Sequence, residues 1–199
     1  MKNDALIPIV VEKNPQGFER SYDIYSRLLK DFIVFVTGPI DMAVANTFIA
    51  QLLYLESVDP EREISVYINS PGGMVTDGLA MYDTMRHVRN EIATINVGLA
   101  ASMGSVILSG GTKGKRFALP ESKTMIHQVL GGVEGQASDI EIAAKETLRV
   151  KSRIIELIAE NSGKKKESVE KDMDRNYWMN AKETKEYGLI DKIMTSKKK

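Results

Sequence analysis

A serine flanked by small residues is the first sign of chemistry in this chain. Ser102 follows a β-branched, apolar run at 92–97 and precedes an apolar run at 106–108, which predicts a strand that turns into a helix at the serine. The unpaired N–H groups at a helix N-terminus stabilise an oxyanion, which a nucleophilic serine requires. The glycines and alanines at 98–104 let another segment approach the hydroxyl. Close packing of a helix against a strand would explain the same small residues, so this stretch alone leaves both interpretations open.

A nucleophilic serine needs a base, and the chain has two histidines. His127 ends an apolar strand and begins the loop 128–135, a place where catalytic side chains lie in open α/β sheets. His87 lies opposite the apolar side of its predicted helix, so we expect it to face solvent or a neighbouring chain. His127 is therefore the preferred base. Ala100 interrupts the G-x-S-x-G pattern around Ser102, so that nucleophile motif is absent.

Composition excludes several other kinds of chemistry. The 199 residues include no cysteine and two histidines, which excludes disulfides, thiol nucleophiles and a polyhistidine metal site. The formal net charge is zero, so neither nucleic acid nor an anionic membrane is expected as the main partner. Residues 110–116 lack the first glycine and the final Ser or Thr of a phosphate-binding loop, so no ATP site and no cofactor are expected. No apolar run approaches the ~20 residues of a membrane helix, which favours a soluble, cytoplasmic protein.

Strand and helix patterns alternate along the chain around the serine. The predicted elements are strands at 32–36, 64–68 and 92–97, helices at 42–55 and 76–89, short strands near 116 and at 124–127, and a last strand led by 187–190. This alternation indicates an α/β fold with right-handed crossovers. No linker divides residues 1–199 into two domains. The helix at 42–55 is apolar almost all round, so it is expected to be buried on all sides.

A long helical pattern covers residues 137–161, and a short helix follows 164–166. At 100° per residue the apolar positions of the long helix cover roughly half of its circumference, whereas a helix on one core needs a stripe of ~100°. The width suggests a second contact surface, on another subunit, which would place Ile154 and Leu157 between subunits. A helix sunk into its own core would show the same pattern.

Six segments, in the order and at the spacing of the family, resemble the ClpP family, the proteolytic subunit of ATP-dependent Clp proteases, and the resemblance covers about residues 5–195. The segments are 20–29 (RSYDIYSRLL), 67–73 (YINSPGG), 98–104 (GLAASMG), 114–117 (GKRF), 125–128 (MIHQ) and 135–142 (GQASDIEI). The resemblance implies an α/β, crotonase-like (ClpP-type) fold with a protruding long handle helix. The handle would cover about 128–161, and residues 1–30 would form the axial, pore-lining segment.

The resemblance also implies an assembly and its partners. Heptameric rings stack as a tetradecamer that encloses the active sites, and a separate Clp ATPase (an AAA+ unfoldase) delivers unfolded protein substrates. The residues that match the family's functional positions are Ser102 as nucleophile, His127 as base, Gly73 and Met103 as oxyanion donors, Val75, Leu130, Gly131 and Gly132 in the substrate clamp, Tyr67 and Phe117 in the ATPase-docking pocket, and Asp174 and Arg175 in ring–ring ion pairs.

Three places depart from the family pattern. Asn176 falls where the family has the aspartate of its triad, and an amide fixes the histidine tautomer only when its oxygen faces the ring. Asp172 or Asp174 would take the third place only after a local shift. Ser65 replaces an aromatic residue near the docking pocket, and one residue is added around 17–19 in the axial segment.

Two functions of different classes follow. The chain is an active serine peptidase fed by an ATPase, or it is a weakly active, mainly structural ClpP paralogue in a mixed assembly with a second ClpP subunit. A coenzyme A-dependent hydratase or isomerase of the crotonase type is a distant third, because the chain is short for that class and a Ser102–His127 pair suits acyl transfer to water.

Overall fold

The computed structural model describes residues 6–13 and 15–195. In chain order its elements are β1 (Ile9–Lys13), β2 (Glu19–Asp23), α1 (Ile24–Leu29), β3 (Ile33–Thr37), α2 (Met42–Val58), β4 (Ile64–Ser70), α3 (Val75–His87), β5 (Ile92–Ala101), α4 (Met103–Ser109), β6 (Arg116–Ala118), β7 (Lys123–Ile126), α5 (Ala137–Ser162), α6 (Lys166–Asp172), β8 (Tyr177–Asn180), α7 (Ala181–Tyr187) and β9 (Lys192–Ile193). The predicted α/β alternation is confirmed.

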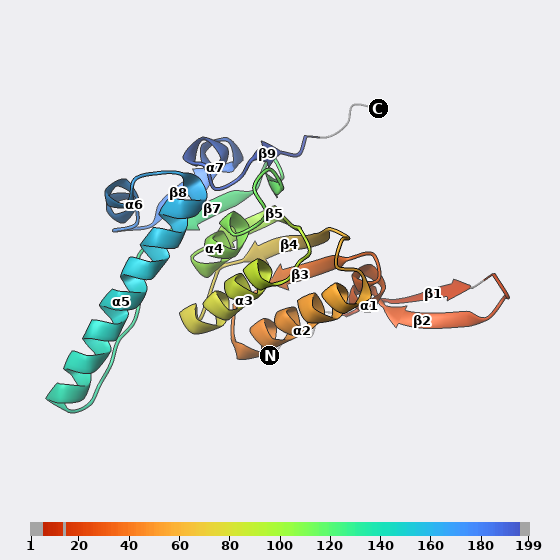
Figure 1. Ribbon diagram of the computed structural model, residues 1–199, viewed down its shortest axis with the longest axis horizontal. Coiled ribbons are helices and arrows are strands. Elements are labelled where there is room, and N and C mark those ends of the chain that lie inside the picture. The colour runs from red at the N-terminus through yellow and green to blue at the C-terminus, as the bar shows by residue number, and fades with distance from the viewer. Residues whose placement is uncertain (1–5, 14, 196–199) are drawn as a thin grey trace.

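The main sheet has seven strands within the described residues. Strands β3, β4, β5, β6 and β9 lie parallel in that order, and β7 pairs with the second half of β5. Figure 1 shows α2, α3 and α4 side by side over one face of this sheet. On β4, Ile64, Val66 and Ile68 are fully buried toward these helices, whereas Ser65 and Tyr67 on the other face are half-buried. The core therefore lies between the sheet and the three helices.

Helix α2 buries only one side. Phe48 and Leu52 pack into the core, but Leu53 and Tyr54 are 48% and 56% exposed. The prediction that this helix is buried on all sides is wrong. Apolar residues occupy both faces of α2, but the single chain covers only the face that packs on the core.

The long helix predicted at 137–161 is confirmed as α5. Its first half stands away from the body (Figure 1), and there Ile142 and Leu148 are 66% and 64% exposed. Its second half packs into the chain's own core through Ile154 and Leu157, so the expectation that these two side chains lie between subunits is wrong. Neither α5 nor any other helix in the described part of the chain is long and apolar enough to cross a membrane.

Several elements escaped the sequence analysis. Strands β1 and β2 form an antiparallel hairpin that projects from the body (Figure 1), and an Arg27–Glu12 ion pair ties the hairpin to α1. Residues 15–17 form the turn between these strands. Helix α7 begins with a capping box in which Asn180 and Glu183 exchange hydrogen bonds.

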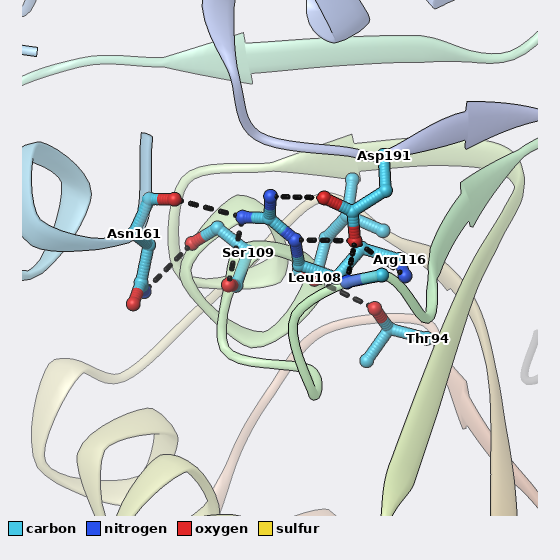
Figure 2. Close-up of polar contacts among 7 residues, drawn as sticks. Thr94, Leu108, Ser109, Arg116, Asn161 and Asp191 are labelled. Carbon is cyan, nitrogen blue, oxygen red and sulfur yellow. Dashed lines mark hydrogen bonds and ion pairs between the residues drawn. The ribbon is translucent and has the colours of Figure 1, made fainter. Parts of the chain in front are cut away.

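A buried arginine joins the ends of four elements (Figure 2). Arg116 on β6 is 3% exposed, and its guanidinium donates to Oδ1 and Oδ2 of Asp191, just before β9, at 2.6 and 2.9 Å. Its Nη1 also donates to the carbonyl of Asn161 in α5 at 2.8 Å and to that of Ser109 in α4 at 3.5 Å. Because a cation is favourable at a helix C-terminus, one guanidinium stabilises the ends of both helices.

Further polar contacts extend this cluster. The amide of Asn161 donates to the hydroxyl of Ser109 at 3.2 Å and accepts from the Tyr82 hydroxyl at 3.3 Å. The hydroxyl of Thr94 on β5 donates to the carbonyl of Leu108 at 2.7 Å (Figure 2). The C-terminal end of α4 is therefore held by α3, α5, β5 and β6, which fixes the position of its N-terminal end.

The Arg116–Asp191 pair predicts a pH-dependent stability. Burial opposes the ionisation of Asp191, but hydrogen bonds from Arg116 outweigh it and hold the pKa of this carboxyl below its ordinary value. We expect Asp191→Asn to lower the free energy of unfolding at pH 7 by about 3 kcal/mol, because the arginine stays buried without its counter-charge. An aspartate with a lowered pKa stabilises the folded state fully above its ordinary pKa of about 3.9. This stabilisation is lost as the pH falls through the lowered pKa of the folded state.

Denaturant unfolding at a series of pH values between 7 and 3 tests this prediction. The difference between wild type and Asp191→Asn should shrink below pH 4. The control is Glu186→Gln, which removes an exposed pair with Lys182 and should cost less than ~1 kcal/mol. A constant difference from pH 7 to pH 3 would contradict the assignment.

Candidate active site

The candidate nucleophile lies at a sharp turn between β5 and α4. Ser102 has a φ of +54° and a ψ of −123°, a conformation that costs a non-glycine residue on the order of 1–3 kcal/mol. Its N–H donates to the carbonyl of Met125 at 2.9 Å, and its own carbonyl accepts from the N–H of Ser105 at 2.9 Å. A strained serine between a strand and a helix is the geometry of a nucleophile elbow. The elbow forms although the G-x-S-x-G motif is absent.

A glycine turn after β4 packs against this elbow. A Cβ on Gly72, which has a φ of +89°, would lie 2.6 Å from the Cβ of Ser102. A Cβ on Gly73 would lie 2.0 Å from the carbonyl oxygen of Ile40. No residue but glycine fits at either position, because backbone presses on both sides of the turn.

Two backbone N–H groups beside Ser102, those of Gly73 and Met103, have no acceptor within the described residues. Met103 is the first residue of α4, so its N–H has no acceptor within the helix. The bridge between Ile40 and the glycine turn uses the carbonyl of Gly72 and the N–H of Met74, and it leaves the N–H of Gly73 unused. The predicted oxyanion donors Gly73 and Met103 therefore lie on the two segments that meet at Ser102.

His127 and Asn176 lie next to the paired ends of two antiparallel strands. His127 directly follows β7 and Asn176 directly precedes β8, and the antiparallel register pairs Ile126 with Tyr177. One step further along the same register, His127 lies opposite Asn176. Both residues line a pocket with Ser102. Within the described residues no hydrogen bond joins these three side chains, and such contacts often tighten only when substrate binds.

Burial sets the basicity of His127. Its half-buried ring has a pKa below the ordinary histidine value because burial disfavours the charged imidazolium. The other candidates for the third place have different partners. Asp172 accepts from the Tyr187 hydroxyl at 3.0 Å, and the carbonyl of Asp174 accepts from the Gln128 amide at 2.8 Å. Asn176 is thus the candidate that the strand register brings to His127.

The pocket has a volume of about 400 Å³ and a largely apolar wall. Of the predicted substrate-binding residues, Val75 and Leu130 line it, whereas Gly131 and Gly132 continue the exposed loop beyond it. The deeper wall includes residues that sequence analysis did not single out for the site, namely Val106, Met125, Ile154, Ile158 and Met173. His87 is exposed on α3, away from this pocket.

The remaining predicted sites lie elsewhere. Tyr67 on β4 and Phe117 on β6 are half-buried and flank Ile95 in one row across the sheet, and Tyr67 stacks on Phe35 with ring centroids 5.5 Å apart. Arg175 lies 3.7 Å from the carboxylate of Asp174, and both side chains are largely exposed. Neither pair contacts Ser102.

A serine in an elbow that shares a pocket with a histidine is typical of serine hydrolases. The family model described as Clp protease matches residues 16–197 of the chain. The chain therefore belongs to the Clp protease family, whose members are serine peptidases that generally work with Clp ATPases and as self-associated rings. The ClpP resemblance and the ClpP-type α/β fold are confirmed.

The position of Asn176 predicts the pH dependence of the site. We expect Ser102 to react when His127 is neutral, so its labelling by a fluorophosphonate should rise with pH around the lowered pKa of His127. In Asn176→Asp a carboxylate faces the ring and raises the histidine pKa, so the midpoint should move to higher pH. A charged hydrogen bond exceeds a neutral one by about 1–2 kcal/mol, so the plateau rate should rise about tenfold.

Labelling rates from pH 5 to pH 9 test this prediction in assembled protein. Asp174→Asn is the matched control and should keep the wild-type midpoint, because the Asp174 carboxylate lies 3.4 Å from the Gln128 amide and 3.7 Å from the Arg175 guanidinium. If the midpoint moves in the control and stays in Asn176→Asp, then Asp174 holds the third place.

Proposed function

We propose that the chain is the serine endopeptidase subunit of a self-compartmentalised cytoplasmic protease that degrades unfolded proteins to short peptides. The observation that carries the proposal is the elbow at Ser102, with the N–H groups of Gly73 and Met103 beside it and His127 in the same pocket. In this proposal residues 1–199 form a single peptidase domain. A Clp ATPase, acting in trans, unfolds the substrates.

The mechanism follows from these groups. His127 takes the proton of the Ser102 hydroxyl, and the Ser102 Oγ attacks a peptide carbonyl. The N–H groups of Gly73 and Met103 stabilise the oxyanion of the tetrahedral intermediate. His127 then protonates the leaving amine, and water, activated by the same histidine, hydrolyses the acyl-enzyme. The carbonyl oxygen of the Asn176 side chain would hold the ring N–H of His127.

The loop after His127 supports the binding of an extended peptide. Residues 128–135 contain no regular secondary structure, so their backbone groups lack strand partners. We propose that Leu130 to Gly132 on one side and Val75 on the other pair with substrate as an added strand. Backbone pairing accepts many sequences, which suits the degradation of unfolded chains.

We propose that assembly uses the surfaces that a single chain leaves open. The exposed first half of α5 serves as the handle between two heptameric rings, which form a tetradecamer, and Asp174 and Arg175 form ion pairs across the ring interface. Tyr67 and Phe117 form part of the docking pocket for the ATPase, and residues 1–30 line the axial entrance. The half-buried aromatic row and the projecting hairpin support these roles.

A weakly active subunit in a mixed assembly with a second ClpP paralogue is the alternative. The neutral Asn176 favours it, because an amide stabilises the imidazolium less than a carboxylate does. Hydrolysis of a short fluorogenic peptide by the purified chain, measured beside its native mass, separates the two functions.

Ser102 is expected to be the residue that a fluorophosphonate labels. Ser102→Ala should abolish labelling and peptide hydrolysis without changing the oligomer, because the side chain makes no hydrogen bond that stabilises α4. The control is Ser57→Ala, which removes an exposed hydroxyl bonded to Tyr54 and should react like wild type. Peptide mapping that finds the label on Ser105 or Ser109 would overturn the assignment.

The exposed half of α5 is expected to control assembly. Leu148→Asp should yield single rings or smaller species in sedimentation velocity, because an unpaired charge buried at an interface is costly. Its melting temperature as a separated species should stay near that of wild-type subunits, since Leu148 is exposed in the single chain. Ile154→Ala, the control in the buried half, should cost about 2–5 kcal/mol of stability but leave the rings stacked. Full-size particles of Leu148→Asp would rule out this role.

A further inference from the structure

A buried hydroxyl lies directly behind the glycine turn. Ser70, the last residue of β4, is fully buried. Its Oγ donates to the carbonyl of Gly38 at 2.6 Å and accepts from the N–H of Gly72 at 3.1 Å. One hydroxyl thus links the turn that follows β3 to the turn that follows β4.

In the described part of the chain, the Ser70 hydroxyl is the one side-chain group that is hydrogen-bonded to the glycine turn, residues 71–74. In the described part of the chain, the other hydrogen bonds of residues 71–74 to neighbouring segments are backbone bonds to Ile40, at 2.8 Å each. On the opposite side, Gly72 presses on Ser102, and a Cβ on Gly104 would lie 3.0 Å from the carbonyl oxygen of Ser70. Ser70 therefore touches both segments that carry the candidate oxyanion donors.

We infer that Ser70 is a positioning residue that sets the N–H of Gly73 for oxyanion binding. The inference rests on the proposed function of the Ser102 site. The N–H of Gly72 and the carbonyl of Gly38 lose their partner when the hydroxyl is removed, and buried groups without partners force the backbone to rearrange. The neighbouring N–H of Gly73 moves with the turn.

The chemistry predicts which kinetic constant changes. Oxyanion donors act mainly in the transition state, so a displaced donor lowers kcat and leaves KM nearly unchanged. Loss of a whole donor costs about 10²–10³ in kcat, so displacement of one should cost about ten- to hundredfold. A merely structural role would instead change stability and the amount of assembled enzyme, with normal kcat per folded site.

The test compares Ser70→Ala with Ser122→Ala in the full assembled enzyme. Ser122 is a matched control, because it is 3% exposed and its hydroxyl donates to the carbonyl of Leu119 at 2.8 Å, outside the pocket. Three quantities are measured per active site: kcat, KM for a fluorogenic peptide, and the inhibition constant of a peptide boronate. The boronate forms a tetrahedral adduct with Ser102 and so reports on the oxyanion donors.

We expect Ser70→Ala to lower kcat about ten- to hundredfold with KM within about twofold, and to weaken the boronate by the same factor. Ser122→Ala should match wild type in all three quantities. Unchanged kcat and boronate binding in Ser70→Ala would overturn the inference while the proposed function stands. Wild-type protein without Ser102-dependent hydrolysis or boronate binding would refute both.

A second variant covers the case in which Ser70→Ala does not assemble. Ser70→Cys keeps the volume of the side chain but replaces the hydroxyl by a weaker hydrogen-bonding group. A lower kcat at retained KM in Ser70→Cys supports positioning. A wild-type kcat in this variant means that Ser70 only fills space, which overturns the inference.

Discussion

The close approach of two backbone segments at Ser102 is the constraint on which the site depends. The glycine turn after β4 comes so near the elbow that a Cβ on Gly72 would stand 2.6 Å from that of Ser102. The serine itself holds a positive φ, which persists only because its N–H is bonded to Met125 and its carbonyl begins α4. The candidate nucleophile and both candidate oxyanion donors therefore lie in one closely packed block, built from the ends of β4 and β5 and the start of α4.

Local sequence patterns predicted where helices and strands lie, but they did not predict what packs against each helix or strand. Strand β4 alternates and α5 repeats at helical spacing, so both could be found from the sequence. The same patterns do not show what covers an apolar face. Helix α2 was expected to be buried all round, yet Leu53 is exposed in the single chain. Helix α5 was expected to be covered by another subunit near Ile154, yet Ile154 is buried within its own chain. The hairpin β1–β2 was not predicted, because its strands are mostly exposed and lack a clear alternation of apolar and polar residues.

The candidate site was predictable where a residue had a local signal. Ser102 had small neighbours between two apolar runs, and His127 ended a strand. Asn176 had no such signal and came from the family resemblance, while β8, whose register places it opposite His127, was missed. The roles of Ser70 and Arg116 were not predicted, because their partners Gly38 and Asp191 lie far away in the sequence. Hydrogen bonds between distant segments produce no periodic pattern in the sequence.

The arrangement of the strands has a consequence for synthesis of the protein. Asn176 enters with β8 and the counter-charge of Arg116 enters with Asp191, so the pocket and its support require residues that are translated after Ser102 and His127. A chain still on the ribosome that ends before Asp191 has an arginine without its partner and no β9 to close the edge of β6. The order in which residues are translated thus keeps the candidate site incomplete until β8 and Asp191 have been made.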